Sequence, residues 1–195
     1  MTATRPNYLL PPPVRWNCDS FHDACDAGLF EGRNVILVDG EILEMPAPNP
    51  PHNTGVELVS EALRAIFHSG YWVRAQMALD LALDIDPVPD VAVIVGSPRT
   101  VTTQPTSALL VVEISDSSFA TDIGPKSHLY AEGGQPEYWV LDLNRRQLHV
   151  FRDPIVDPSV PRGHRYATVS IFGSTDSVSS LAQPSATVRV ADLLP

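Results

Sequence analysis

Two nearly continuous apolar segments, VPDVAVIV (88–95) and SALLVVEIS (107–115), constrain the fold more strongly than any other part of the sequence. Apolar runs of this kind are typical of central strands that are covered on both faces. Each segment nevertheless carries one carboxylate, Asp90 in the first and Glu113 in the second. Burying a carboxylate is costly unless something pairs with it, so each acid requires a partner elsewhere in the chain or a bound cation.

The two acids are expected to meet at one end of the sheet. If the segments pair antiparallel with Val95 opposite Ala108, Asp90 lies opposite Glu113. Like charges directly across a strand pair repel, so either one carboxyl group is protonated or a cation bridges the two. Carboxylate oxygens are hard donors that suit Mg²⁺ or Mn²⁺ and suit zinc poorly.

Lys126 is the only lysine of the chain. Gly124 and Pro125 precede it and predict the start of a helix, because proline is tolerated in a first turn. This helix is expected to end at Gly133-Gly134, and its first turn can bring Lys126 back to the end of the strand that carries Glu113. An ammonium group beside two carboxylates and a metal ion can orient a water or stabilise a developing negative charge.

The remaining elements follow from periodicity and turn signals. Asp39-Gly40 between two apolar runs predicts a hairpin. Alternation of apolar residues from 71 to 85 predicts a strand, bent or broken because of its length. The other expected elements are a helix at about 20–27 capped by Asp19 or Ser20, a loop at 46–53, a helix at 56–67 and a hairpin at 137–153. The order predicts a mixed α/β (α+β) fold, with helices on a sheet and extra hairpins at each side.

Length and composition suit one globular domain. We expect a Pro-rich arm over 1–17 and a single domain over 18–195, which is long enough to bury a core. No apolar run approaches the roughly 20 residues that span a bilayer, and the N-terminus does not resemble a signal peptide. A cytoplasmic location without a membrane partner is therefore expected. The net charge of −10 argues against loose, charge-driven binding of nucleic acid, although an enzyme with a locally basic cleft stays possible.

The ordered set of motifs resembles the PD-(D/E)XK nuclease superfamily and, within it, the Uma family of putative restriction endonucleases. The resemblance spans about 18–194. The matching segments are VDGEILEM (38–45) with His52 after it, VPDVAVI (88–94), LLVVEIS (109–115) and DIGPKSHLYAEGGQPEYWVLDLNRRQLHVFR (122–152). It implies a restriction-endonuclease-like fold, in which a central mixed β-sheet is flanked by helices.

The resemblance also implies a function and a set of site residues. Asp90 and Glu113 would bind Mg²⁺ or Mn²⁺, and water activated by the metal would cleave a phosphodiester bond in DNA with the help of a lysine. This chain has Ser115 two positions after Glu113, where the superfamily pattern has the lysine. In the Uma pattern the lysine lies on the following helix, which indicates Lys126. A homodimer is a further implication.

Three more residues are candidates for the site. Glu57, on the polar side of the helix at 56–67, resembles an extra acid that some superfamily members place there. Gln76 could line the cleft, or it could be an exposed strand residue. His52 could contact phosphate or act as an acid, or it could be a structural loop histidine.

Each principal candidate also has a purely structural interpretation. Asp90 could form a turn after proline, and Glu113 could form an ion pair with an arginine such as Arg74. Lys126 could be a solvated residue, although a cation is not favoured at a helix N-terminus. Tyr130 shares a helix face with Lys126 and is expected to serve packing. The alternatives to a nuclease are a catalytically silent binding or regulatory module and a metal-dependent hydrolase of a smaller phosphoester.

Overall fold

Six strands form one mixed sheet in the order β3-β4-β5-β6-β7-β8. Their bounds are Tyr71–Ala75, Val91–Val95, Leu110–Ser115, Glu137–Asp142, Gln147–Val156 and His164–Gly173. Neighbouring strands are antiparallel except β5 and β6, which run parallel. A parallel pair needs a crossover connection, and the segment between β5 and β6 supplies it with helical turns. The predicted mixed α/β class is confirmed.

The computed structural model describes residues 14–33, 35–38, 40–44, 49–81 and 87–195. Most of the arm predicted over 1–17 lies outside these ranges. In the described part of the chain, no helix has the length and apolar character needed to cross a membrane.

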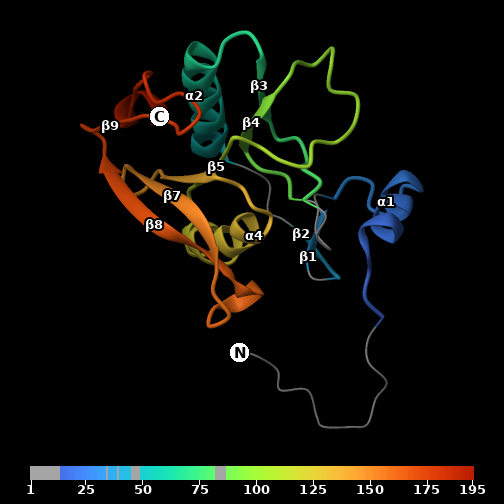
Figure 1. The fold of residues 1–195 in the computed structure, drawn as a ribbon. Helices are drawn as coiled ribbons and strands as arrows, with labels where there is room; N and C mark the ends of the chain where they lie inside the picture. Colours follow the sequence, from blue (N-terminus) through green and yellow to red (C-terminus); the bar gives the residue numbers. More distant parts are fainter. Residues whose placement is uncertain (1–13, 34, 39, 45–48, 82–86) are drawn as a thin grey trace.

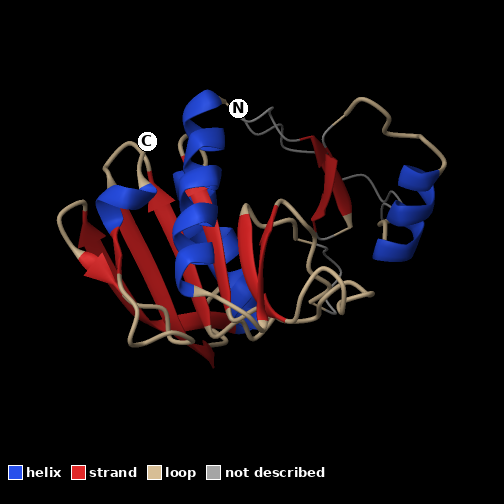
Figure 2. Ribbon diagram, turned by 90° about the horizontal axis from the view of Figure 1, so that it is seen from above, coloured by secondary structure: helices blue, strands red, loops and turns tan. Residues whose placement is uncertain are grey.

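Helices cover both faces of the sheet, as Figures 1 and 2 show. On one face α2 (Pro50–Ile66) packs through Val56, Val59 and Leu63 against strand residues such as Val91 and Val112. On the other face α4 (Ser127–Glu132) packs through Tyr130 and Ala131. Each central strand therefore buries both of its faces, which explains the continuous apolar runs of the sequence.

The predicted register of the two central strands is confirmed. Val91 lies opposite Val112, and Val93 lies opposite Leu110. Asp90 immediately precedes β4, so its backbone lies at the same end of the sheet as Glu113 on β5. The hairpin around Gly40 is also confirmed, with β1 (Val35–Val38) antiparallel to β2 (Glu41–Glu44).

The strand predicted over 71–85 is much shorter in the structure. β3 ends at Ala75, because Gln76 adopts a positive φ of 51°, which a regular strand does not allow. Leu79 and Leu81 are still buried against the sheet. The alternating pattern therefore comes partly from an irregular segment with alternate side chains packed inward, and a single-sequence pattern does not separate this case from a strand.

Helix starts were predicted too late. α2 begins at Pro50 and not at 56, because Asn49 accepts a hydrogen bond from the His52 amide and two prolines occupy a first turn that lacks partners for its amides. α1 (Cys18–Asp26) is capped by Asn17, which forms a reciprocal pair of hydrogen bonds with Ser20. The cap predicted at Asp19 or Ser20 is therefore wrong by two or three positions.

The helix after β5 also differs from the prediction. It begins with α3 (Phe119–Thr121), continues as a π-helical turn, η1 (Asp122–Lys126), and only then becomes α4. Pro125 lies inside the π-turn and not at a helix start. Proline removes a donor that a regular α-helix would use, and π-turns of this kind are frequent at functional sites.

The C-terminal segment closes the α2 face of the sheet. β9 (Ser177–Val178) pairs with β10 (Val188–Arg189), and η3 (Val190–Leu193) follows. Val190 and Leu193 are buried in the core beside α2. The 137–153 region forms the expected hairpin of β6 and β7, and η2 (Pro161–Gly163) lies in the connection from β7 to β8.

Candidate active site

The candidate site forms where β4 and β5 part. Their pairing ends with Val91 opposite Val112, while β5 continues to Ser115 beside β6. Beyond that point the Ile114 amide donates a hydrogen bond to Oδ2 of Asp90 at 2.8 Å. The Asp90 carboxylate thus satisfies a strand amide that β4 does not reach, and this bond brings it beside the β5 residues at the sheet end.

Glu113 is buried on the α4 face of the sheet, with 2% of its surface exposed. Its Oε1 accepts a hydrogen bond from the Tyr130 hydroxyl at 2.8 Å, and its Oε2 lies 3.0 Å from Nζ of Lys126. The pKa of Glu113 is raised to about 8, mainly by burial; the charges of Asp90 and Asp122 also raise it, while Lys126 and the Tyr130 hydrogen bond oppose the rise. The predicted alternative, an ion pair with Arg74, is wrong because Lys126 fills that role.

Lys126 lies between two buried acids. Its Nζ is 2.9 Å from Oδ1 of Asp122 as well as 3.0 Å from Oε2 of Glu113. Burial alone would lower the pKa of Lys126, but the two carboxylates outweigh it and hold the pKa above its usual value. Lys126 therefore carries a full positive charge at neutral pH. It ends η1 and does not occupy a first turn, so the argument from the helix dipole does not apply to it.

Asp122 was not among the predicted site residues. It is fully buried, its carboxylate accepts a hydrogen bond from the Ser118 hydroxyl, and its backbone carbonyl accepts one from Tyr138 at 2.9 Å. Its spacing of four residues from Lys126 was the available signal. A helix start placed at Gly124 left Asp122 outside the helix and concealed that signal.

Asp90 is paired with His52 from the first turn of α2. Its Oδ2 lies 3.1 Å from Nε2 of His52. Burial would raise the pKa of Asp90, but the bonds from His52 and from the Ile114 amide lower it. The same bond raises the pKa of His52. His52 thus belongs to a helix and not to a loop, and it contacts a candidate metal ligand directly.

The structure brings four of the six predicted site residues together: His52, Asp90, Glu113 and Lys126. Gln76 lies next to this group through its backbone, since its backbone N–H donates a hydrogen bond to the Asp90 carbonyl at 3.0 Å. Gln76 itself is exposed. Glu57 lies exposed on α2, and within the described residues it has no hydrogen bond or ion pair to this group. Tyr130 is buried as predicted, and in addition it donates to Glu113.

The donor chemistry fits a hard divalent cation. Within the described ranges no group of three or more His, Cys, Asp or Glu residues is placed to hold a metal ion. Mg²⁺, however, is commonly bound through one or two carboxylates together with waters and substrate phosphates. Asp90 and Glu113 form such a pair, and the charge of Asp90 raises the pKa of Glu113, a repulsion that a cation between them would relieve.

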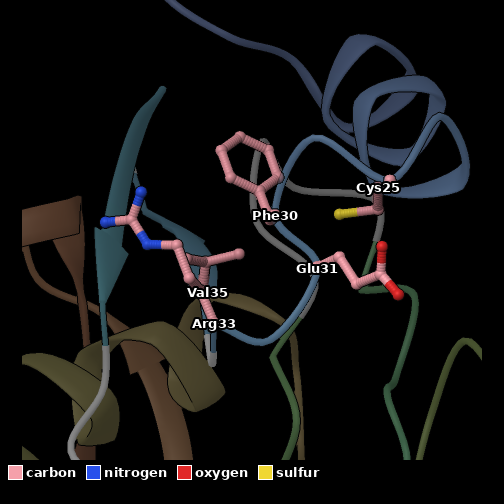
Figure 3. Close-up of a pocket in the computed structure, with 6 residues that line it drawn as sticks. Cys25, Phe30, Glu31, Arg33 and Val35 are labelled. Carbon is pink, nitrogen blue, oxygen red and sulfur yellow. The ribbon is translucent and has the colours of Figure 1, made fainter.

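A separate pocket of about 560 Å³ lies beside α1 and β1 (Figure 3). It is lined by Cys25, Gly28, Phe30, Glu31, Arg33 and Val35. Arg33 is engaged in an exposed ion pair with Glu44 at 2.7 Å. None of the six predicted site residues lines this pocket, so it is not part of the candidate active site.

Comparison with known proteins agrees with the fold and the motifs. A family model, Uma2, described as "Putative restriction endonuclease", matches residues 18–191. A crystal structure described as a putative nuclease belonging to DUF820, from Anabaena variabilis ATCC 29413, superposes with a TM-score of 0.64 over 93% of this chain and 97% of that chain. The two sequences are 15% identical, so this likeness shows a shared fold. No curated protein matches the sequence.

Proposed function

We propose that this chain, which belongs to the Uma2 family of putative restriction endonucleases, is a nuclease that hydrolyses phosphodiester bonds in DNA. One observation carries the proposal: Asp90, Glu113 and Lys126 lie together, largely buried, at the point where β4 and β5 separate. Buried ionisable groups with shifted pKa values gather at functional sites more often than elsewhere. Resemblance and geometry therefore indicate the same three residues.

Asp90 and Glu113 are the proposed ligands of Mg²⁺ or Mn²⁺. When bound, such an ion supplies Lewis acidity and charge neutralisation at a phosphodiester. His52 holds Asp90 through Nε2, and the Ile114 amide fixes the same carboxylate oxygen. These two contacts orient Asp90 and keep it ionised, which is the state that a metal ligand requires.

Lys126 is proposed to stabilise negative charge on the phosphorus centre. Because its pKa is raised, it stays protonated at neutral pH and is poorly suited to act as a base. A fixed ammonium group in a partly buried site stabilises a charge that develops during reaction more strongly than it would in water. Asp122 holds the ammonium in place, since it contacts Nζ at 2.9 Å.

A plasmid-cleavage time course in Mg²⁺, Mn²⁺ or EDTA tests this function. The wild type should nick plasmid only with a divalent ion, and Glu113→Gln and Lys126→Met should each slow cleavage by about 10²-fold or more. Glu61→Gln is the matched control, because Glu61 is exposed on α2. Cleavage in EDTA, or full activity of Glu113→Gln, would contradict the proposal.

A second candidate is a catalytically silent nuclease fold that acts as a binding or regulatory module. Two observations favour it: both carboxylate oxygens of Glu113 already have internal partners, and Ser115 occupies the position of the usual lysine. Under this alternative the wild type binds DNA but cleaves none with either metal, and Glu113→Gln is equally inactive.

A further inference from the structure

Arg74 is a buried arginine that has no counter-ion among the described residues. It lies on the edge strand β3 with 8% of its surface exposed, and its Nε and Nη1 are buried without a hydrogen-bond partner. Burial alone accounts for the lowering of its pKa, so no carboxylate among the described residues compensates its charge. Its guanidinium lies over the ring of Trp72, 5.1 Å from the centroid.

This arrangement is costly for the free protein. Arginine is not deprotonated in proteins, and an uncompensated buried charge strongly destabilises a fold. The cation–π contact with Trp72 offsets only part of that cost. Two buried donors of the guanidinium, Nε and Nη1, are therefore open to an anion that the described residues do not provide.

Arg74 lies on the same face of the sheet as Glu113, with strand β4 between them. Arg74 is opposite Ala92, and Ala92 is opposite Val111. Val111 and Glu113 are two residues apart on β5 and so point to the same face. The cross-strand row of Arg74, Ala92 and Val111 is therefore one step, about 7 Å, along the strands from the row that contains Glu113.

We propose that Arg74 is an anion-binding residue that contacts a phosphate of the nucleic-acid strand beside the phosphodiester held at Asp90 and Glu113. This inference rests on the proposed function for the identity of the ligand. The guanidinium fork matches the oxygens of a phosphate group and binds them in pairs. The chain has 13 basic and 23 acidic residues, so phosphate contacts have to come from a few placed cations and not from a general basic surface.

Thermal unfolding with inorganic phosphate tests the anion site without any need for cleavage. Phosphate should raise the Tm of the wild type above its value in chloride of equal ionic strength, since a ligand that binds only the folded state stabilises it. Arg74→Met should abolish this rise, and without phosphate it should melt at a higher temperature than the wild type. Arg74→Lys, which keeps the charge but loses the fork, should retain a smaller rise. Arg64→Met, an exposed arginine on α2, should respond as the wild type does.

A short DNA duplex in EDTA distinguishes bound nucleic acid from free phosphate. In fluorescence anisotropy, Arg74→Met should lower the slope of log Kd against log salt by about one relative to the wild type, as expected for one lost phosphate contact. Arg64→Met should leave the slope unchanged. A phosphate-dependent rise in Tm with an unaltered DNA slope would limit the site to free phosphate and overturn the nucleic-acid contact.

Equal phosphate responses in wild type and Arg74→Met would overturn the anion site itself. Failure of the nuclease proposal gives a different pattern, because it would leave plasmid intact while the phosphate response of Arg74 persisted. The two proposals are therefore separated by two independent readouts.

Discussion

At the scale of single residues, Glu113 determines the electrostatics of the site. It is almost fully buried, its pKa is raised to about 8, and its two oxygens contact Tyr130 and Lys126. A carboxylate in this position is unfavourable for stability alone. Lys126 compensates this cost in part, since its Nζ lies 3.0 Å from Oε2 of Glu113.

The pH dependence of stability reports this burial. The folded-state pKa of Glu113 is about 8 and its ordinary value is 4.5, so the folded protein binds more protons than the unfolded chain between these values. Stability contributed by Glu113 is therefore present below pH 4.5 and is lost as the pH rises towards 8. As the pH rises, the free energy of unfolding of the wild type should therefore fall relative to that of Glu113→Gln, by up to about 1.4 kcal/mol per pH unit.

Urea denaturation at pH 5, 6, 7 and 8, each about one unit apart across the interval set by these pKa values, measures this difference. Glu61→Gln, the exposed control on α2, should follow the wild type at every pH. A constant difference between wild type and Glu113→Gln across the series would show that Glu113 is ionised throughout.

The proximity of Asp90 and Glu113 could be predicted from the sequence, because pairing two apolar segments in one register fixes which residues lie opposite each other. Val91 opposite Val112 places Asp90 beside the Glu113 end without knowledge of the rest of the fold. Asp122 could not be found in the same way. Its role depends on a helical turn that begins earlier than Gly124 and Pro125 indicate.

At the scale of elements, the π-turn η1 connects the sheet to the site. It brings the side chain of Lys126 against the carboxylate of Asp122, four residues earlier, so that the two form an ion pair. The Tyr138 hydroxyl on β6 donates a hydrogen bond to the Asp122 backbone carbonyl. A π-turn widens the helix locally. The sequence around η1 does not indicate a π-turn, because the turn is favoured by tertiary contacts such as the one between Tyr138 and Asp122.

Asp122→Asn tests whether η1 positions the lysine. The change removes the charge that holds Lys126 but keeps the size of the side chain, so the cleavage rate should fall by about 10–100-fold, as typical for a residue that orients a functional group. Plasmid cleavage by purified protein measures the rate, and near-UV circular dichroism checks the fold. Asp19→Asn on the exposed side of α1 should cleave at the wild-type rate; an unaffected Asp122→Asn would show that Lys126 needs no second anchor.

Other elements show where sequence patterns mislead. Two prolines before His52 indicate a loop, yet they fill the first turn of α2 because that turn needs no amide donors. Alternating apolar residues continue beyond Ala75, yet the strand ends there because Gln76 adopts a positive φ. In both cases element type was predictable and the boundary depended on capping or tertiary contacts.

At the scale of the whole molecule, a second buried charge cluster ties the C-terminal segment to the sheet. Glu137 on β6 is fully buried, accepts hydrogen bonds from Arg152 at 2.6 and 2.9 Å, and also accepts from the Ser180 hydroxyl and the Leu181 amide. Trp139 donates to the same carboxylate at 3.0 Å. Every bond of this cluster is internal, which indicates a structural role.

Glu137→Gln should therefore destabilise the protein without changing its chemistry. Breaking one partner of a buried ion pair typically costs about 3–5 kcal/mol, because Arg152 is left uncompensated. Urea denaturation measures the loss. Glu44→Gln removes an exposed ion pair with Arg33 and should have a much smaller effect, as surface pairs contribute little. Equal losses for the two variants would contradict the distinction between them.

The broad architecture was the most predictable level. The order of helices and strands, the central position of the two apolar strands and the hairpin of β6 and β7 all follow from periodicity and turn signals. A single domain over 18–195, a homodimer and a cytoplasmic location remain predictions. They concern assembly and surroundings, which the fold of one chain does not determine.

The most direct test of the central claim is a Mn²⁺ titration followed by electron paramagnetic resonance of the free ion. The wild type should bind Mn²⁺ saturably and release it to excess Mg²⁺. Glu113→Gln should weaken binding by more than the roughly 10–100-fold typical of losing an outer-shell partner, while Glu61→Gln should bind as the wild type does. If Glu113→Gln binds Mn²⁺ as tightly as the wild type, or if the wild type binds none, Asp90 and Glu113 are not the metal ligands of this nuclease fold.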